Sequence, residues 1–183
     1  MTAWMGLQSL TFYVMLAWLP KIFLDAGLPA DQAGYLLSLT TLVQVGATLA
    51  VPVLAGRRPS QVPYVMAATL LTAAGYVAVL VAPATLPWLS MIVLGVGQGA
   101  SFALALLIIA MRPADPAEVT ALSAVAQSAG YLLAAVGPLV FGLLRQESGG
   151  WTAPLVFGLA MVGLQLVAGW FAGRPATLGK AYL

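Results

Sequence analysis

Three glutamines in this chain are each followed, four residues later, by an aromatic residue. The pairs are Gln8 and Phe12, Gln98 and Phe102, and Gln127 and Tyr131. Residues at i and i+4 lie on one face of a helix, so each pair would present an amide beside a ring. The amide offers two donors and an acceptor, and the ring offers a flat apolar wall. Together these groups suit a small polar or anionic solute.

The same glutamines also have a plainer interpretation. Buried glutamine amides bond neighbouring membrane helices, at roughly 0.6–2 kcal/mol per bond. Taken singly, each glutamine fits this structural role better, but as a set on three different segments they favour a shared cavity. Thr41, Gln44 and Thr48 lie on one face of a further segment. Gln44 is a candidate for the same cavity, although threonine hydroxyls bond back to the preceding helical turn equally well.

The composition restricts what these groups can do. The 183 residues include seven basic and five acidic ones, 62% are hydrophobic, and the mean hydropathy is +1.00, whereas a soluble domain is about 25% charged. This excludes a soluble enzyme, a nucleic-acid-binding protein and a disordered regulator, and it indicates an integral protein of the lipid bilayer. Cysteine and histidine are absent from the sequence, which removes thiolate sites, most zinc sites and Ser-His catalysis. No base lies beside a serine in an apolar segment, so we expect no enzyme activity, no metal and no cofactor.

Runs without a charged residue delimit the helices that must position these groups. A charge at the bilayer centre costs about 2.5–3.5 kcal/mol, and the charge-free runs are 1–20, 32–56, 59–111, 119–144 and 148–173. The third run would make a helix of about 80 Å, far more than a hydrocarbon core of about 30 Å, so it must turn within 83–87. Long apolar runs without alternation favour helices over barrel strands. The predicted membrane-spanning helices are 2–24, 32–55, 62–82, 87–111, 118–144 and 152–173, with start signals at Asp31, Pro63 and Asp115-Pro116.

Six spans divide into two groups of three, which must enter the membrane in opposite senses because three is odd. We therefore predict a single six-helix membrane domain over 1–183, made of two inverted three-helix repeats at about 1–82 and about 83–183, as in secondary transporters. Basic residues in short loops favour the cytoplasmic side. On one side lie Arg57, Arg58, Arg112, Arg174 and Lys180, and on the other lie Lys21 and Arg145. This asymmetry predicts both termini in the cytoplasm, with the protein in the inner (plasma) membrane.

Two small-residue features mark helix contacts or bends. Gly95 and Gly99 have GxxxG spacing, which predicts close contact with another helix beside Gln98. Gly137-Pro138 would free a carbonyl and bend the fifth helix.

Three sequence blocks resemble a known family. They are Met5-Gly-Leu-Gln-Ser-Leu-Thr-Phe-Tyr13 with Trp18-Leu-Pro20, Leu94-Gly-Val-Gly-Gln-Gly-Ala-Ser-Phe102-Ala-Leu-Ala-Leu106, and Leu122-Ser-Ala-Val-Ala-Gln-Ser-Ala-Gly-Tyr131-Leu-Leu-Ala-Ala-Val-Gly-Pro138. Together they are similar to the C-terminal half of the cyanate/2-nitroimidazole permease family of the major facilitator superfamily. The resemblance covers essentially the whole chain, as that family's helices seven to twelve, and implies an all-α six-helix half of a twelve-helix transporter.

The resemblance also implies roles for the helices and for individual residues. The first and fourth helices would line a central cavity, the second and fifth would flank it as gates, and the third and sixth would support them from outside. The implied cavity residues are Gln8, Phe12, Tyr13, Gln98 and Phe102, and the implied flanking residues are Gln44, Gln127 and Tyr131. The cavity in this superfamily lies between two halves, so the chain would pair with an N-terminal half or with a copy of itself. The loop with Arg57 and Arg58 keeps the superfamily's basic pair there but lacks the usual acidic residue.

The expected function is half of a secondary active transporter, which moves a small polar or anionic organic solute across the membrane by alternating access. The alternative is a non-transporting membrane fragment or a structural or assembly module. The first apolar helix begins almost at Met1, which slightly favours a cut through a longer protein over a natural start.

Overall fold

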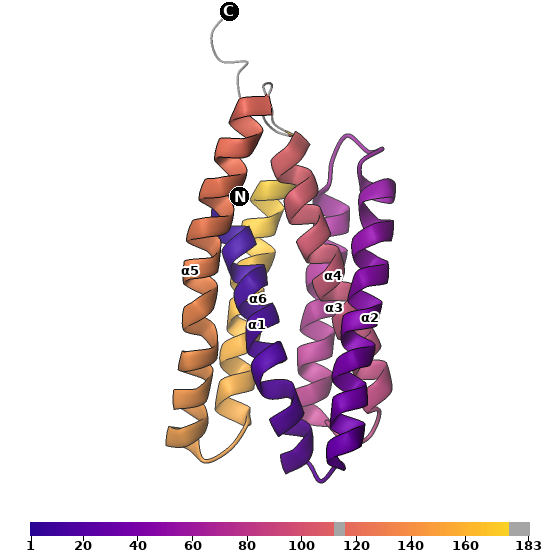
Figure 1. Ribbon diagram of the computed structural model, residues 1–183, viewed down its shortest axis with the longest axis vertical. Helices are drawn as coiled ribbons and strands as arrows, with labels where there is room; N and C mark the ends of the chain where they lie inside the picture. The colour runs from indigo at the N-terminus through magenta and orange to yellow at the C-terminus, as the bar shows by residue number, and fades with distance from the viewer. Residues whose placement is uncertain (112–115, 176–183) are drawn as a thin grey trace, which may run out of the picture.

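The computed structural model describes residues 1–111 and 116–175, with the backbone alone at 116–118. Its helices stand side by side in one bundle (Figure 1). They are α1 (Thr2–Asp25), α2 (Ala30–Ala55), α3 (Val62–Val81), α4 (Pro87–Met111), α5 (Pro116–Ser148) and α6 (Thr152–Gly173). Each is long and apolar enough to cross a membrane, where a helix satisfies its own backbone hydrogen bonds. The predicted all-α, six-span fold class is confirmed.

The ends of α5 and α2 differ from the predicted spans. α5 continues to Ser148, beyond the predicted end at 144, because Arg145 and Glu147 end the charge-free run without interrupting the helical hydrogen bonds. α2 begins at Ala30, so Asp31 lies in its first turn instead of preceding the helix. Pro29 has an extended backbone and directly precedes the first helical residue. Asp31 in the first turn still complements the helix dipole.

The other two predicted start signals fall at or beside the helix starts. Pro63 lies in the first turn of α3, where its missing N–H would have no helical acceptor. Asp115, predicted to begin the fifth helix, lies outside the described residues, although α5 does begin at Pro116.

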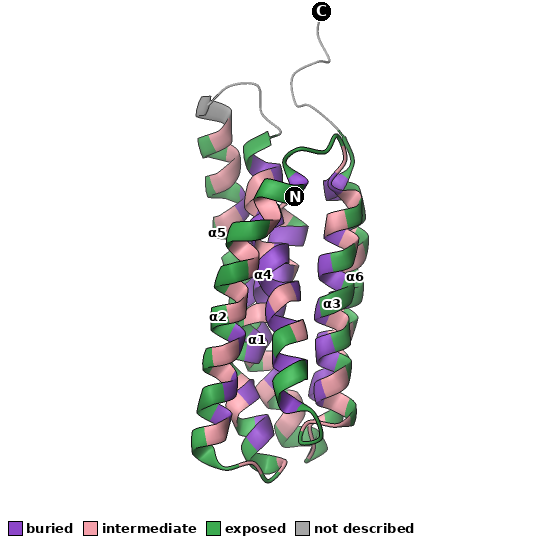
Figure 2. Cartoon of the chain, turned by 90° about the vertical axis from the view of Figure 1, so that its right-hand side faces the viewer, coloured by how far each residue is buried: buried purple, intermediate pink, exposed green. Residues whose placement is uncertain are grey.

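α1 and α4 form the centre of the bundle. In their most apolar windows 56% and 67% of the residues are buried, against 17% to 39% in the other four helices. Figure 2 shows this difference, with α4 mostly buried and α2 mostly exposed or intermediate. In Figure 1, α5 and α2 lie at the left and right margins with α1 and α4 between them. α1 and α4, which carry the two glutamine–phenylalanine pairs, are therefore the helices most shielded from lipid.

The second helix of each predicted repeat packs on the first helix of the other. α1 packs chiefly on α5, and α4 packs chiefly on α2 and α3. Glycines permit the close approach: a Cβ on Gly6 would lie 3.2 Å from Cα of Gly130, and one on Gly99 would lie 2.5 Å from the carbonyl oxygen of Gln44. A Cβ on Gly95 would lie 2.8 Å from the Thr40 carbonyl oxygen. The helix contact predicted from the GxxxG spacing is thus confirmed, with α2 as the partner.

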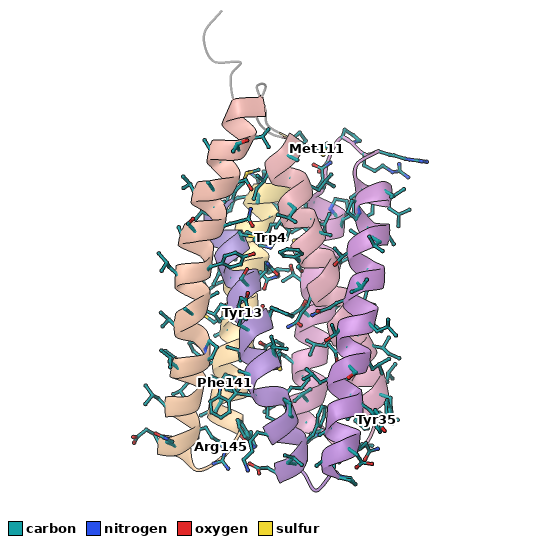
Figure 3. The ribbon with its side chains drawn as sticks, viewed as in Figure 1. Trp4, Tyr13, Tyr35, Met111, Phe141 and Arg145 are labelled. Atoms are coloured by element: carbon teal, nitrogen blue, oxygen red, sulfur yellow. The ribbon has the colours of Figure 1, made fainter. Side chains whose placement is uncertain are left out.

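A cluster of aromatic and charged groups joins α1, α5 and α6 at the lower end of the bundle. The ring of Trp18 stacks on that of Phe141, with centroids 6.4 Å apart, and lies 5.9 Å from that of Trp151. Asp25 accepts from Lys21 Nζ at 2.7 Å, from Trp151 Nε1 at 3.1 Å and from Arg145 Nη2 at 3.4 Å. Figure 3 labels Phe141 and Arg145 in this region. These contacts fix α1 against α5 below the glutamine-bearing segments.

Candidate solute-binding site

A cavity of about 270 Å³ lies between α1, α2, α4 and α5. It has the volume of about nine water molecules at ~30 Å³ each, which suits a small solute. We call it the glutamine cavity, and its lining residues are Gln8, Ser9, Phe12, Tyr13, Gln44, Thr48, Gln98, Gly99, Phe102 and Tyr131. Seven of the eight residues named from the sequence are therefore brought together around one space.

Gln127 is the predicted residue that the structure does not bring into the glutamine cavity. It lies on α5 four residues before Tyr131, and its Nε2 donates to Ser123 Oγ at 2.6 Å on the same helix. Of the pair formed by Gln127 and Tyr131, only the Tyr131 ring lines the cavity. A direct role of Gln127 in solute binding stays a prediction.

Two glutamine–phenylalanine pairs face the cavity from the two central helices. Gln8 and Phe12 line it from α1, and Gln98 and Phe102 line it from α4. The i, i+4 spacing puts both members of each pair on the inner face. Both amides are almost completely buried, with Gln8 3% and Gln98 4% exposed. The first helix of each predicted repeat thus contributes one such pair to the cavity wall.

Gln98 connects three helices beside the cavity. Its Oε1 accepts a hydrogen bond from Nε2 of Gln44 on α2 at 3.0 Å, and its own Nε2 donates to the Thr11 carbonyl oxygen on α1 at 3.3 Å. Thr48 adds a second link, because its hydroxyl donates to the Gly99 carbonyl oxygen at 3.2 Å. A change in the separation of α2 and α4 would therefore alter the amides that face the cavity.

The amide of Gln8 bonds only within its own helix. Its Nε2 donates to Ser9 Oγ at 2.9 Å and more weakly to Met5 Sδ at 3.8 Å. Within the described part of the chain nothing donates to its Oε1, so this oxygen keeps its full capacity to accept a hydrogen bond from a solute. The two glutamines therefore differ in their anchoring: the Gln98 amide is hydrogen-bonded to two other helices, and the Gln8 amide is hydrogen-bonded to residues of α1.

A buried polar network supports the cavity from behind. Tyr76 on α3, which is 0% exposed, donates its hydroxyl to the Thr11 carbonyl oxygen at 2.7 Å. The Thr11 hydroxyl donates to Gln8 O at 2.9 Å and reaches Gln165 Oε1 on α6 at 3.3 Å. Gln165 Nε2 donates in turn to Ser101 Oγ at 3.4 Å. Gln165 is 1% exposed, so it packs inside the bundle as Tyr76 does.

Aromatic rings form the outer rim of the cavity. The rings of Phe12 and Tyr13 contact edge to face with centroids 5.2 Å apart, and Tyr13 contacts Tyr131 in the same way at 6.4 Å. Both tyrosines are 39% exposed, so the cavity reaches the molecular surface beside them. The same two tyrosines also line a more open groove of about 530 Å³ between α1 and α5. Figure 3 shows Tyr13 about halfway along α1, so the rim lies near the middle of the span.

The lining of the glutamine cavity carries no formal charge. Its polar groups are amides and hydroxyls, and no Asp, Glu, Lys or Arg is among the residues that line it. An anionic solute would be met here by N–H and O–H donors alone, so the protein buries no charge of its own, while the anion still has to be desolvated.

Sequence reasoning left Ser9, Thr48 and Gly99 out of the cavity lining. Thr41 and Thr48 share a helix face, but their hydroxyls have different partners. The Thr41 hydroxyl donates to the Leu37 carbonyl oxygen on its own helix at 3.0 Å, whereas the Thr48 hydroxyl donates to a carbonyl oxygen on α4. Ser9 and Gly99 each directly follow one of the cavity glutamines, and that adjacency was the available signal.

Several known transporters are similar to this chain in sequence. The chain is 39% identical over 94% of its length to the uncharacterized transporter YycB of Bacillus subtilis. It is 35% identical over 94% of its length to the 2-nitroimidazole transporter of Escherichia coli, and 33% identical over 91% to the cyanate transport protein CynX of the same organism. The chain spans less than half of the length of these relatives, 43% to 44%. No family model matches the chain.

The three relatives are transporters of the major facilitator type. Together with six helices that are able to span a bilayer, they indicate a multi-pass membrane protein. The resemblance noted in the sequence is therefore confirmed: over 91% to 94% of its length this chain is homologous to transporters that include a 2-nitroimidazole transporter and a cyanate transport protein.

Proposed function

We propose that this chain is half of a secondary active transporter that moves a small polar or anionic organic solute by alternating access. The observation that carries the proposal is the glutamine cavity, in which Gln8 and Gln98 from the two central helices face one space rimmed by Tyr13 and Tyr131. Amides orient a polar solute through hydrogen bonds, and rings exclude water around its flat faces. A cavity at mid-span between helices is where transporters of this kind bind their solutes.

The partner that completes the pathway is a second six-helix half or a second copy of this chain. The rim tyrosines are exposed, so one side of the cavity is open in the isolated chain. The relatives are more than twice as long as the region that matches, which favours an N-terminal half over a homodimer. Rocking of the two halves about the cavity would expose it to each side of the membrane in turn.

The proposed domain is a single unit over 1–183 with inverted repeats at about 1–82 and 83–183. The reciprocal packing of α1 on α5 and of α4 on α2 supports the repeats, since exchanging the two triplets of helices exchanges these two contacts. We place both termini in the cytoplasm and the chain in the inner (plasma) membrane. Arg57 and Arg58 follow the end of α2 and Arg174 follows the end of α6. This orientation rests on the bias of such basic residues toward the cytoplasm.

We propose small substrates, because the relatives are named as transporters of small solutes. Cyanate and 2-nitroimidazole both present hydrogen-bonding atoms on a compact frame, and a cavity of about 270 Å³ accommodates solutes of that size. The absence of charge in the lining favours recognition by hydrogen bonding over recognition by an ion pair.

Uptake by proteoliposomes tests the proposal, with the protein at its full expressed length and with labelled cyanate and 2-nitroimidazole as solutes. Gln98→Ala is expected to raise the half-saturating solute concentration about 2- to 12-fold, the equivalent of one neutral hydrogen bond. Gln146→Ala is the matched control, because Gln146 is exposed near the end of α5, and it should transport as the wild type does.

The outcome also separates transport from the alternative of a non-transporting module. Saturable uptake that is weakened by Gln98→Ala and unaffected by Gln146→Ala supports the transporter and its site. Equal uptake by both variants would remove the site assignment. No uptake of any small solute by a correctly inserted protein would favour the structural or assembly role.

A further inference from the structure

The turn between α2 and α3 carries two adjacent arginines beside an apolar hollow. Arg57 and Arg58 are exposed, and together with Val53, Leu54 and Tyr64 they line a space of about 400 Å³. The sequence lacks the acidic residue that the resemblance leads one to expect in this loop. Within the described residues neither guanidinium makes an ion pair or a side-chain hydrogen bond. Two cationic groups are thus presented together without a counter-ion among the residues that the structure describes.

The other cationic side chains that the structure describes are engaged. Lys21 and Arg145 both contact Asp25, at 2.7 and 3.4 Å. Arg174 lies over the rings of Trp170 and Phe171, at 5.6 and 5.1 Å from their centroids. The contrast makes the arginine pair a distinct feature of this surface.

The backbone of the turn is held firmly, so the two arginine side chains project from fixed backbone positions. Gln61 is 5% exposed, and its Nε2 donates to the Arg58 carbonyl oxygen at 2.8 Å. The backbone N–H of Gln61 also donates to the Gly173 carbonyl oxygen at the end of α6, at 3.2 Å. A ligand that bridges Arg57 and Arg58 therefore does not have to order the turn first.

The hollow continues into an apolar stripe along α2. Val53 and Leu54 are 58% and 59% exposed, and Leu49 and Val45 extend the same face by one and two further turns with 70% and 53% exposed. Val45, Leu49 and Val53 are spaced four residues apart, which keeps them on one side of the helix, and Leu54 lies directly beside Val53. The site is therefore cationic where the span ends and apolar along the span.

We propose that this site binds an anionic phospholipid, with the headgroup phosphate between Arg57 and Arg58 and an acyl chain along the α2 stripe. The guanidinium fork matches two phosphate oxygens. Tyr64 supplies an aromatic group at the level of the headgroups, where such rings are favoured. A basic pocket at the end of membrane helices attracts anionic lipid from its leaflet. The proposal is independent of the transported solute, because the glutamine cavity shares no residue with this site.

A lipid titration of the delipidated protein in mild detergent, at its full expressed length, tests the proposal. The unfolding temperature is measured against phosphatidylglycerol, phosphatidylcholine and inorganic phosphate. Phosphatidylglycerol should raise it saturably, while the other two should not. Arg57→Gln and Arg58→Gln should each raise the midpoint concentration about fivefold, and the double variant should raise it about 30-fold.

The matched control is Lys21→Gln, which removes one exposed positive charge near the end of α1, at the end of the bundle away from the arginine pair. Its midpoint concentration should equal that of the wild type. An unchanged midpoint in the double arginine variant would overturn the proposal, and so would an equal loss in Lys21→Gln. An equal response to phosphatidylcholine would show that the headgroup charge is not recognised. An equal response to inorganic phosphate would assign the arginines to a free anion instead of a lipid. The single variants keep the test decisive if the double variant does not insert.

Discussion

Replacing Gly99 by alanine tests the close packing of α2 on α4 that shapes the glutamine cavity. A Cβ at this position would lie 2.5 Å from the carbonyl oxygen of Gln44 and 2.8 Å from its Cα. Both atoms belong to the backbone of α2, so no side-chain rotation relieves the overlap. Ordinary contact begins at 3.4 Å, and the two helices would therefore have to separate by roughly 1 Å.

The expected loss of stability follows from this displacement. Overpacking of a closely packed interface costs about 1–3 kcal/mol, and the better helix propensity of alanine offsets up to about 1 kcal/mol. A shift of about 1 Å would stretch the 3.0 Å bond between Gln44 and Gln98 beyond hydrogen-bonding range, which costs roughly a further 0.6–1.7 kcal/mol. With the full offset from helix propensity, we expect Gly99→Ala to lower the free energy of unfolding by about 1–4 kcal/mol.

The assay is reversible unfolding in mixed micelles, followed by circular dichroism, with Gly46→Ala as the matched control. Gly46 lies on α2, and a Cβ there would meet nothing within 4 Å. Because the substitution is the same and only the packing differs, Gly46→Ala should be neutral or slightly stabilising. The same samples can be assayed for solute uptake, which should weaken in Gly99→Ala alone.

The packing argument is refuted if the two variants unfold at the same free energy. It is also refuted if Gly99→Ala is destabilised while the affinity for solute stays at the wild-type value. In that case α2 would hold α4 without setting the position of the cavity amides.

Two further predictions concern the groups that hold the cavity in place. Tyr76→Phe removes the hydroxyl that donates to the Thr11 carbonyl oxygen, and it should lower the free energy of unfolding by roughly 0.6–1.7 kcal/mol in the same assay; Tyr35→Phe, at a tyrosine 64% exposed, should have no effect, and equal stability of both variants would contradict the role of the network. Asp25→Asn removes both ion pairs at the lower end of the bundle, and since these groups are partly exposed the loss should be smaller than for Tyr76→Phe and should shrink as salt is raised; a large loss that is insensitive to salt would contradict this.

The spans were readable from the sequence because charge is so costly in a bilayer. Charged residues bound the apolar runs, and the turn within 83–87 follows from length alone. The positions of charged residues do not show where the helical hydrogen bonds end. For that reason the predicted span stops at 144, although α5 continues past Arg145 to Ser148. The start of α2 was misplaced for a similar reason. Asp31 suggested a cap, but the backbone of Pro29 already fulfils that role.

The candidate site was readable only in part. The i, i+4 spacing puts Gln8 with Phe12 and Gln98 with Phe102, because helix geometry is local. Which helix faces reach the same cavity depends on how helices rotate and pack, and that is decided by contacts far apart in sequence. Gln127 has the same spacing as the other two, yet only Tyr131 of its pair lines the cavity. The Gln127 amide lies one turn farther along the same side of α5 and bonds to Ser123 Oγ. The link from Tyr76 to Thr11 likewise joins residues with no local relation.

The reciprocal packing of the helices has a consequence for synthesis of the protein. The face of α1 that carries Gly6 is covered by α5, which leaves the ribosome about 120 residues later. At roughly 5–20 residues per second this takes on the order of 6–25 s. During that interval the first three helices lie in the bilayer with a notch at Gly6 that lipid tails fill poorly. A nascent chain arrested before α5 is complete would therefore leave this surface of α1 without the helix that packs on it.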